Sequence, residues 1–465
     1  MERDKRYFFC GIGGSGMLPL AAIVRARGAE VAGSDRALDQ GRSSAKFDWL
    51  RAQGIALFPQ DGSGIESADQ TVVASAAVEE SVPDIVAAAR VGAARMTRPE
   101  LLAELFNAAP LGIGVGGTSG KSTVTGMIAW ILHACGRDPT VMNGAVMKNF
   151  AGDDTPFTSA LVGKGDAFVT ELDESDGSIA MFRPSIAVLT NVTLDHKSLD
   201  ELNALFTGFL ERAEAAIVNA DDPEAAALAE GLAVGKLQTF SIGGVADLVA
   251  HDVVEEPLGS SCALSTKEGW AALRLAVPGR HNVSNALAAL SAARACGIEL
   301  DKAAAVLAEF KGLRRRFEIV GTANGVTVID DFAHNPDKIA ATLRTLHAFP
   351  GRLLIFFQPH GYGPLRTMRD ELIACFVREM AEEDRLVMCD PVYYGGTTNR
   401  SVGSEAIVEG VAKGGRAATH IADREACGDW LAGMAREGDR IVVMGARDDS
   451  LTEFAEGVLA PGRRA

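Results

Sequence analysis

The chain has 465 residues, of which 47% are hydrophobic, and this length suggests about three domains of ~150 residues each. A net charge of −16 argues against a nucleic-acid or anionic-membrane partner. No apolar run reaches the roughly 18 residues of a membrane-spanning helix. The N-terminus lacks the apolar core of a signal peptide, and the seven cysteines show no C-x-x-C spacing. We therefore expect a cytoplasmic protein with reduced thiols.

The first motif is a glycine-rich turn near the N-terminus. Tyr7–Cys10 predicts a strand, Gly11–Gly16 reads G-x-G-x-x-G, and a helix follows as far as Arg27. Asp35 lies 19 residues after the last glycine, at the end of a second predicted strand. This pattern is typical of a βαβ unit that binds a dinucleotide, with the acid on the ribose. Two other interpretations remain open, namely a nucleotide-sugar diphosphate on the same helix N-terminus and a tight turn without ligand.

The most informative motif is a second glycine loop. Leu111–Val115 predicts a strand, Gly117–Thr123 reads G-T-S-G-K-S-T, and Val124–His133 predicts a helix. Backbone N–H groups of such a loop surround phosphate oxygens, and the helix N-terminus adds positive potential. Lys121 can reach the β- and γ-phosphates, and the hydroxyl of Ser122 can bind Mg²⁺. The sequence does not match the full G-x-x-x-x-G-K-[ST] signature, because Val115 occupies the position of its first glycine. It does match the shorter form G-x-x-G-K-S.

Polar segments follow two further predicted strands of the middle region. The acidic segment Glu171–Ser178 comes directly after Ala167–Thr170, and Asn191–His196 follows Ile186–Leu189. Carboxylates at a strand end beside a phosphate loop can hold Mg²⁺ directly or through water. An acidic surface turn and a histidine without a site role are the alternatives. Gly279–Asn282 then begins a long predicted helix.

A third set of strands and helices follows three consecutive arginines, Arg314–Arg316. These arginines form either a solvated charge run or a group that binds transferred phosphate. Asp330–Pro336 lies at the end of a predicted strand, where α/β proteins bind ligands. The whole pattern predicts an α/β protein of three domains. They are a Rossmann-like domain at residues 1–107, a central P-loop ATPase-like domain with a parallel sheet at 108–313, and a C-terminal Rossmann-like domain at 314–465.

Seven motifs in this order resemble the Mur ligase family, and within it the alanine-adding branch, over nearly the whole chain. The matching segments are Gly11–Met17 with Gly33-Ser34-Asp35, Gly117–Thr123, Glu171–Ser178, Asn191 with Asp195-His196, Gly279–Asn285, Arg315-Arg316-Phe317 with Asp330–Pro336, and Phe357-Gln358-Pro359-His360. The short form of the glycine loop is the normal form in that family.

The resemblance implies an ATP-dependent acid–amino-acid ligase. ATP would phosphorylate a carboxylate to an acyl phosphate, which an amine then attacks to form an amide. L-alanine and UDP-N-acetylmuramate are the first expectation for the substrates, in peptidoglycan synthesis. The implied cofactors are ATP and two Mg²⁺ ions. The implied partners are small molecules only, and the chain is expected to be a monomer or a homodimer.

The resemblance also assigns roles to individual residues. It implies catalytic roles for Lys121, Glu171, His196, Arg316 and Asp331. It implies metal binding by Ser122, Glu171 and His196. It implies ATP binding by Gly117, Thr118, Ser119, Gly120, Lys121, Ser122, Thr123, His281, Asn282, Asn285, Arg316, Asp331 and His334. It implies substrate binding by Gly11, Gly13, Gly14, Ser15, Gly16, Met17, Ser34, Asp35, Ser175 and His360.

The chain differs from the alanine-adding branch at five places. Ser119 replaces a histidine, Lys197-Ser198 replaces Met-Asp, Asn335 replaces the second histidine of H-H-P, and Gly361–Pro364 replaces R-[YF]-T-R. The segment Tyr393–Arg400 also differs. Other hypotheses are therefore a ligase for a different acid or amine, in muropeptide recycling or specialised metabolism, an NAD(P)-dependent oxidoreductase, and a non-catalytic nucleotide-binding homologue.

Overall fold

The structure is a computed structural model that describes residues 4–75, 78–193, 197–233, 235–392, 400–446, 448, 450–458 and 460. The chain divides into two compact units, Met1–Gly312 and Leu313–Ala465. Both units alternate strands and helices, so the predicted α/β class is confirmed. Among the described helices, none is both long and apolar enough to cross a membrane.

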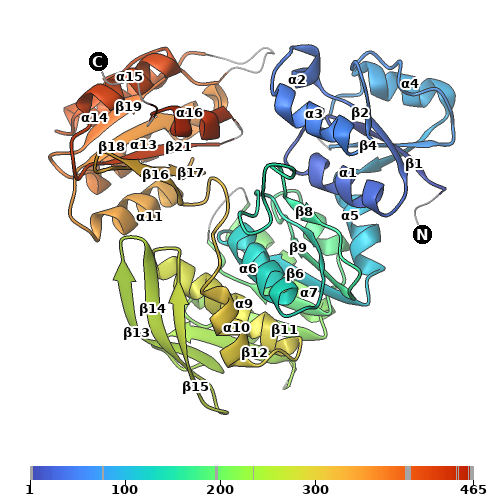
Figure 1. The fold of residues 1–465 in the computed structure, drawn as a ribbon, viewed down its shortest axis with the longest axis horizontal. Coiled ribbons are helices and arrows are strands. Elements are labelled where there is room, and N and C mark those ends of the chain that lie inside the picture. Colours follow the sequence, from blue (N-terminus) through green and yellow to red (C-terminus); the bar gives the residue numbers. More distant parts are fainter. Residues whose placement is uncertain are drawn as a thin grey trace. The chain divides into compact units, whose positions relative to one another are not determined.

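A parallel sheet begins the first unit (Figure 1). Its strand order is β3-β2-β1-β4-β5, and every neighbouring pair is parallel, as in a Rossmann fold. The strands are β1 Arg6–Cys10, β2 Glu30–Ser34, β3 Ala56–Phe58, β4 Gln70–Ala74 and β5 Ala94–Thr97. The helices are α1 Met17–Ala26, α2 Arg36–Asp39, α3 Ser44–Ala52, α4 Pro83–Val91 and α5 Arg98–Asn107. A capping box between Thr97 and Glu100 fixes the start of α5.

The second sheet of this unit has the order β15-β14-β13-β12-β11-β10-β6-β9-β7-β8. Its strands are β6 Leu111–Gly116, β7 Thr140–Met142, β8 Ala160–Leu161, β9 Ala167–Glu171, β10 Ile186–Leu189, β11 Ala215–Asn219, β12 Leu237–Ile242, β13 Leu248–Glu256, β14 Gly259–Ser265 and β15 Trp270–Leu275. The helices are α6 Lys121–Ala134, α7 Leu199–Arg212, α8 Pro223–Ala229, α9 Arg280–Ala295 and α10 Leu300–Leu307, with a short 3₁₀ helix η1 at Ser178–Met181.

The strands from β13 to β7 are parallel, and antiparallel strands extend this sheet at both ends. Strand β10 is buried at every position, whereas buried and partly exposed residues alternate along β14. A strand covered on both faces by helices needs apolar side chains throughout, but an antiparallel strand with one open face does not. The predicted parallel sheet is thus the core of a larger mixed sheet.

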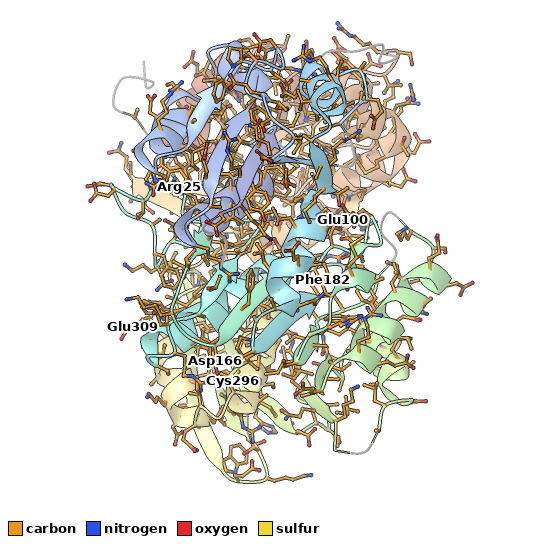
Figure 2. All side chains as sticks on the ribbon, turned by 90° about the vertical axis from the view of Figure 1, so that its right-hand side faces the viewer. Arg25, Glu100, Asp166, Phe182, Cys296 and Glu309 are labelled. Carbon is orange, nitrogen blue, oxygen red and sulfur yellow. The ribbon has the colours of Figure 1, made fainter. Side chains whose placement is uncertain are left out.

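Aromatic packing joins the two sheets of the first unit. The ring of Phe106, on α5, lies 5.8 Å from that of Phe168 on β9 and 5.5 Å from that of Phe182. The Asn107 side chain accepts a hydrogen bond from the backbone N–H of Arg183 at 2.8 Å and donates one to the carbonyl of Met181 at 3.0 Å. Phe182 lies beside α5 at this junction (Figure 2). The first two sheets therefore share one apolar core.

The second unit contains a six-stranded sheet of order β16-β17-β21-β18-β19-β20, in which only the β16–β17 pair is antiparallel. The strands are β16 Glu318–Ala323, β17 Val326–Asp331, β18 Leu353–Gln358, β19 Arg385–Met388, β20 Ala418–His420 and β21 Arg440–Gly445. The helices are α11 Pro336–His347, α12 Tyr362–Thr367, α13 Arg369–Glu379, α14 Ser404–Lys413, α15 Arg424–Met434 and α16 Ser450–Val458.

Candidate functional site

The glycine loop between β6 and α6 has a backbone that only glycine fits. Gly117 has φ 128° and Gly120 has φ 83°, and both values lie in the region that favours glycine. A Cβ atom at Gly117 would overlap the hydroxyl of Thr190, and one at Gly120 would lie 2.5 Å from Asn285 Oδ1. The loop is therefore packed closely against the segment that follows β10 on one side and against α9 on the other.

Two loop side chains contact carboxylates at the end of β9 and in the turn that follows it. Ser122 Oγ donates a hydrogen bond to Glu171 Oε2 at 2.7 Å, and Glu171 is the last residue of β9. Lys121 Nζ donates to the Gly117 carbonyl at 2.6 Å and to Glu174 Oε2 at 2.8 Å. Because β9 lies next to β6, parallel pairing brings these carboxylates to the carboxyl edge of the sheet beside the loop.

A segment after β10 holds the loop from the other side. Asn191 Oδ1 accepts hydrogen bonds from Thr118 Oγ1 at 2.7 Å and from the backbone N–H of Ser119 at 2.9 Å. Thr190 Oγ1 donates to the Ser119 carbonyl at 2.7 Å, and Thr193 Oγ1 lies 2.8 Å from Thr118 Oγ1. We call Thr190, Asn191 and Thr193 the loop clamp. The sequence motif contained Asn191 but gave no sign that its amide would hold the loop.

The structure describes two of the three predicted metal ligands. Ser122 and Glu171 lie together, whereas His196, with Asp195, falls outside the described residues. Within the described chain, no group of three His, Cys, Asp or Glu side chains forms a metal cluster. A hydroxyl and a single carboxylate nevertheless fit Mg²⁺, which prefers oxygen donors and takes its remaining ligands from water and substrate phosphates.

The first turn of α9 lies against the glycine loop. Asn285 is buried, and a Cβ atom placed at Gly120 would meet its Oδ1 first. Its Nδ2 donates to Asn282 Oδ1 at 3.2 Å, and Asn282 Nδ2 donates to the Pro278 carbonyl at 2.7 Å. His281 is exposed on the same turn. The structure thus brings Asn285 to the loop and Asn282 against Asn285, and the contact of all three residues with ATP stays a prediction.

The acidic turn after β9 has an internal hydrogen bond. The backbone N–H of Ser175 donates to Asp173 Oδ1 at 2.9 Å. Burial raises the pKa of Asp173, but hydrogen bonds from Ser175 and the charges of Lys121 and Arg98 outweigh it, so the net pKa lies below its usual value. Asp173 is therefore ionised near neutral pH, and Ser175, the predicted substrate-binding residue, is exposed at the tip of the turn.

The N-terminal glycine loop is stabilised by a carboxylate. Asp35 Oδ2 accepts a hydrogen bond from the N–H of Gly13 at 2.8 Å, and Asp35 Oδ1 caps α2 by accepting from Ala37 at 2.8 Å. Gly14, Ser15 and Gly16 form the turn that precedes Met17, the first residue of α1. The loop begins at Gly11, whose φ is 80°.

Ser34, another predicted substrate-binding residue, is fully buried beneath this loop. Its hydroxyl donates to the carboxylate of Asp84, which also accepts from the Gly62 N–H at 3.0 Å. Burial raises the pKa of Asp84. The side chain of Ser34 therefore supports the fold, and any contact with substrate through it stays a prediction.

The arginines of the second unit have different environments. Arg315 is buried and donates to the Gly445 and Asp448 carbonyls, both at 2.8 Å, while its Nε lies 3.3 Å from the fully buried Asp330. Burial raises the pKa of Asp330 to about 7 although Arg315 opposes this. The guanidinium of Arg316 lies over the ring of Phe332, 4.3 Å from its centroid. Arg315 is therefore structural, and neither sequence interpretation anticipated its burial.

Three other predicted residues of the second unit lie at or just after the ends of β17 and β18. Asp331, the last residue of β17, accepts a hydrogen bond from the Phe317 N–H at 3.0 Å and another from the hydroxyl of Thr342. The rings of His334 and His360 are 5.2 Å apart, edge to face. Burial lowers the pKa of His334 to about 3, so the ring is neutral near pH 7. Its Nδ1 lies 2.8 Å from a backbone carbonyl, which leaves Nε2 as an acceptor.

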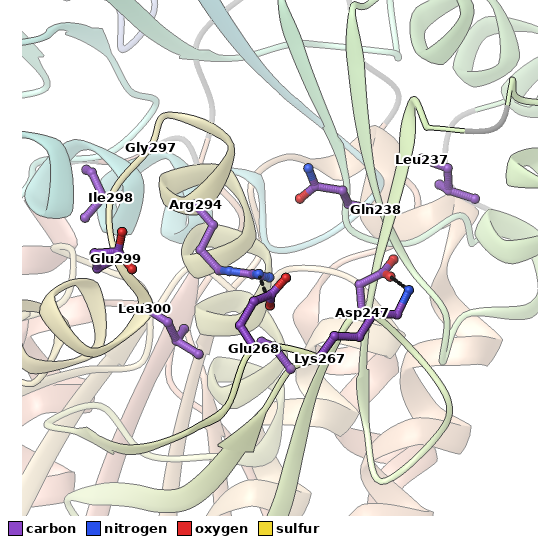
Figure 3. A pocket seen from close by; sticks show the side chains of 11 residues that line it. Leu237, Gln238, Asp247, Lys267, Glu268, Arg294, Gly297, Ile298, Glu299 and Leu300 are labelled. Atoms are coloured by element: carbon purple, nitrogen blue, oxygen red, sulfur yellow. Dashed lines mark hydrogen bonds and ion pairs between the residues drawn. The ribbon is translucent and has the colours of Figure 1, made fainter.

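A surface pocket of about 460 Å³ lies away from these residues (Figure 3). Arg294 and Gly297, at the end of α9, line it, whereas the start of the same helix contacts the glycine loop. A helix of 16 residues spans roughly 24 Å. Arg294 pairs with Glu268 at 2.8 Å, and Lys267 lies 3.8 Å from Asp247. The charged groups of the pocket are thus largely paired with one another.

Family models match the chain in three consecutive stretches. Residues 6–109 match "Mur ligase family, catalytic domain", residues 115–293 match "Mur ligase middle domain", and residues 315–447 match "Mur ligase, glutamate ligase domain". The chain belongs to the Mur ligase family. This Mur ligase is an ATP-dependent acid–amino-acid ligase, and Mur ligases in general use ATP and Mg²⁺.

Curated relatives of this Mur ligase extend over most of its length. A UDP-N-acetylmuramate–L-alanine ligase of Acidithiobacillus ferrooxidans is 38% identical, and the match covers 89% of each chain. The enzyme of the same name from Mycobacterium sp. (strain JLS) is 38% identical over 96% of this chain and 93% of its own. That of Rhizobium meliloti is 34% identical over 96% and 94%.

Solved structures share the fold of this Mur ligase. The UDP-N-acetylmuramate–alanine ligase of Thermotoga maritima superposes with a TM-score of 0.78 at 24% identity, covering 98% of both chains. A murein peptide ligase of Psychrobacter arcticus gives a TM-score of 0.72 at 24% identity, also covering 98% of both chains. At this level of identity the likeness concerns the fold alone.

Proposed function

We propose that this Mur ligase joins L-alanine to UDP-N-acetylmuramate in peptidoglycan synthesis, in the cytoplasm. The observation that carries the proposal is the glycine loop itself. Ser122 contacts a carboxylate at the end of β9 and Lys121 one in the turn after it, in a chain that matches Mur ligase models along three stretches. Relatives at 34–38% identity that carry this name support the choice of substrates.

The reaction must overcome two chemical obstacles. A carboxylate is a poor electrophile, and it repels the γ-phosphate of ATP because both are anions. Transfer of the phosphoryl group to a carboxylate oxygen yields ADP and an acyl phosphate. The amine nitrogen then attacks the carbonyl carbon, the amide bond forms, the C–O bond to phosphate breaks, and the nitrogen loses a proton. Positive groups that offset the anionic repulsion are the catalyst's main contribution.

The loop residues fit the first of these steps. Lys121 would place its ammonium on the β- and γ-phosphates, and the loop N–H groups would hold the phosphate oxygens. Ser122 and Glu171 would hold one Mg²⁺ ion, and His196 would bind a second. Bound Mg²⁺ neutralises charge on the transferred phosphate. Arg316, Asp331 and His334 would contribute further contacts to ATP, and the Gly11–Met17 loop with Asp35 would bind the nucleotide sugar.

The same proposal includes the organisation of the chain. The domains would extend over residues 1–107, 108–313 and 314–465, with small molecules as the only ligands and no nucleic acid among them. The protein would act as a monomer or a homodimer.

Phosphate release from ATP tests the proposed function. The assay combines the purified chain with Mg²⁺, UDP-N-acetylmuramate and each amino acid of a panel in turn. We expect release only when both the nucleotide sugar and L-alanine are present. Release with a different amino acid would retain the ligase and change its amine, whereas no release with any of them would contradict the assignment to peptidoglycan synthesis.

A second candidate is a ligase of the same chemistry with a different acid or amine. The loop after β18 favours it, because Gly361 has φ 145°, a conformation that residues with a side chain rarely adopt. The alanine-adding branch carries an arginine at that position. The backbone conformation of this loop favours glycine there instead, so the loop differs from that of the branch in both side chain and backbone. The same assay with peptide amines and with UDP-linked or free muramic acids distinguishes the two candidates.

A further inference from the structure

The lysine of the glycine loop already has a carboxylate partner that the motif did not reveal. Lys121 Nζ lies 2.8 Å from Glu174 Oε2, and the two side chains are only 18% and 6% exposed. Water screens an ion pair poorly when both groups are largely buried. Glu174 is therefore placed to compete with another anion for Lys121.

Glu174 and Glu171 approach different groups of the loop. Glu171 ends β9 and accepts a hydrogen bond from Ser122, the residue that fits a metal. Glu174 follows three positions later, within the acidic turn, and accepts from Lys121. The two carboxylates therefore bind different groups, Glu171 the hydroxyl of Ser122 and Glu174 the ammonium of Lys121.

An ammonium group has three N–H donors, and Lys121 uses one on the Gly117 carbonyl at 2.6 Å and one on Glu174. A triphosphate that binds in the loop needs donors of the same ammonium. The phosphate oxygens and the Glu174 carboxylate are therefore two anions that compete for one ammonium group.

We propose that Glu174 is a positioning residue that competes with nucleotide phosphates for Lys121, so that ATP binds and ADP leaves by exchange of anions on Nζ. The proposal rests on the proposed use of ATP but makes no statement on the acid or the amine. If Lys121 pairs with Glu174 for most of the time, the apparent affinity for nucleotide equals the affinity of the free lysine state multiplied by the fraction of time that the lysine is free. When the phosphates depart, Glu174 recaptures the lysine and assists product release.

The test is Glu174→Gln, which keeps the shape and an acceptor oxygen but removes the charge. Calorimetric titration of the full chain with ATP, and separately with ADP, gives the dissociation constants with Mg²⁺ and in EDTA. We expect both nucleotides to bind about fivefold more tightly, with and without metal, because a lysine paired for about 80% of the time is freed. Asp176→Asn is the matched control. This change removes a charge from the same turn, but the ion-pair partner of Asp176 is Arg98, 3.9 Å away, so the affinity should stay within about twofold.

A double-mutant cycle then tests whether the effect acts through the lysine. In the Lys121→Ala background, Glu174→Gln should change nucleotide affinity by less than about 1.5-fold. Tightening that persists without the lysine would overturn the proposal. If Glu174→Gln bound nucleotide more weakly in Mg²⁺ but not in EDTA, Glu174 would be a metal ligand and the proposal would be overturned. Unchanged nucleotide affinity of this variant in both conditions would overturn the proposal too.

Circular dichroism checks that each variant folds. Glu174→Asp, which withdraws the carboxylate by one methylene, replaces the glutamine variant if that one does not fold, and should tighten binding by about twofold, less than glutamine does. An unaltered chain that fails to bind ATP contradicts the proposed function as well. An unaltered chain that binds ATP with the same affinity as Glu174→Gln contradicts the Glu174 inference alone.

Discussion

The two glycine loops of the first unit have the same position in their domains and different chemistry. Each joins a parallel strand to a helix, β1 to α1 and β6 to α6. The central loop carries its own cation, Lys121. Near the N-terminal loop the cations come from other helices, since Lys46 of α3 donates to the Gly13 carbonyl at 3.1 Å and Arg98 of α5 lies beside Gly16.

The carboxylates also differ between the loops. Asp35 accepts a hydrogen bond from a backbone N–H of the N-terminal loop, so it occupies a donor that a phosphate could otherwise use. In the central loop, Glu171 and Glu174 contact side chains instead. Glycine spacing thus specifies the turn, whereas the placement of charge decides which anion the turn can bind. The following changes test this contrast, from the largest expected effect to the smallest.

Lys121→Ala should reduce ATP-dependent phosphate release by about 10³-fold, because the γ-phosphate loses the cation that offsets its charge in the transition state. Binding of UDP-N-acetylmuramate should stay within about twofold, since the N-terminal loop takes its cations from elsewhere. Enzymatic phosphate release and calorimetry measure the two effects. Loss of nucleotide-sugar binding would show that the loops do not serve separate ligands.

Gly117→Ala and Gly11→Ala compare the two backbones. Both glycines have positive φ, but a Cβ at Gly117 would overlap Thr190, and one at Gly11 would meet no atom within 4 Å. We expect a loss of about 1 kcal/mol in the free energy of unfolding for Gly11→Ala, from backbone strain alone. For Gly117→Ala we expect about 3 kcal/mol, since crowding adds to strain. Urea denaturation measures both, and equal losses would contradict the crowding.

Asn191→Ala and Asp35→Asn compare the side chains that hold each loop. The Asn191 amide makes three hydrogen bonds to Thr118 and Ser119, so its removal should cost about 2 kcal/mol of stability and weaken ATP binding. Asp35→Asn keeps one acceptor oxygen and should cost about 1 kcal/mol, with the nucleotide sugar affected rather than ATP. If both variants weakened the same ligand, the separation of the loops would be wrong.

The buried Asp84 beneath the N-terminal loop predicts a small pH effect. Burial raises its pKa in the folded chain, so between the unfolded and folded pKa values the folded state binds more protons than the unfolded state. Its contribution to stability is complete below the unfolded pKa and is lost as pH rises through the folded pKa. Hydrogen exchange of β1 and β4 from pH 4 upward should show this decline, and Asp84→Asn should flatten it. A slope unchanged in that variant would assign the effect to another group.

Local patterns predicted much of this molecule. The strands β1, β6, β9 and β10 lie where apolar runs predicted them, and both glycine loops precede helices. The motif order placed Lys121, Ser122 and Glu171 in one site because P-loop geometry depends on residues that are near in sequence or at the ends of adjacent strands. Apolar runs reveal the strands that carry these residues, and the structure shows that β6 and β9 are paired.

Other contacts depend on tertiary packing, and the sequence alone did not predict them. Nothing local to Glu174 shows that it would take Lys121 rather than point into water like its neighbour Ser175. Three adjacent arginines look alike in sequence, yet burial selects Arg315 as the partner of Asp330. The antiparallel extension of the central sheet was missed for a related reason, since the alternating pattern of β14 is short and carries little signal alone.

The helix α6, which begins at Lys121, is followed directly by a partly exposed cysteine. Cys135 directly follows α6 and is half-buried, whereas Cys10, Cys262, Cys375, Cys389 and Cys427 are buried. Burial raises the pKa of Cys10 to about 12 and that of the half-buried Cys296 to about 11, and a protonated thiol reacts slowly with maleimides. A fluorophore directed to Cys135 would therefore report on the opposite end of the helix that starts at the phosphate loop, in a chain with all its native cysteines.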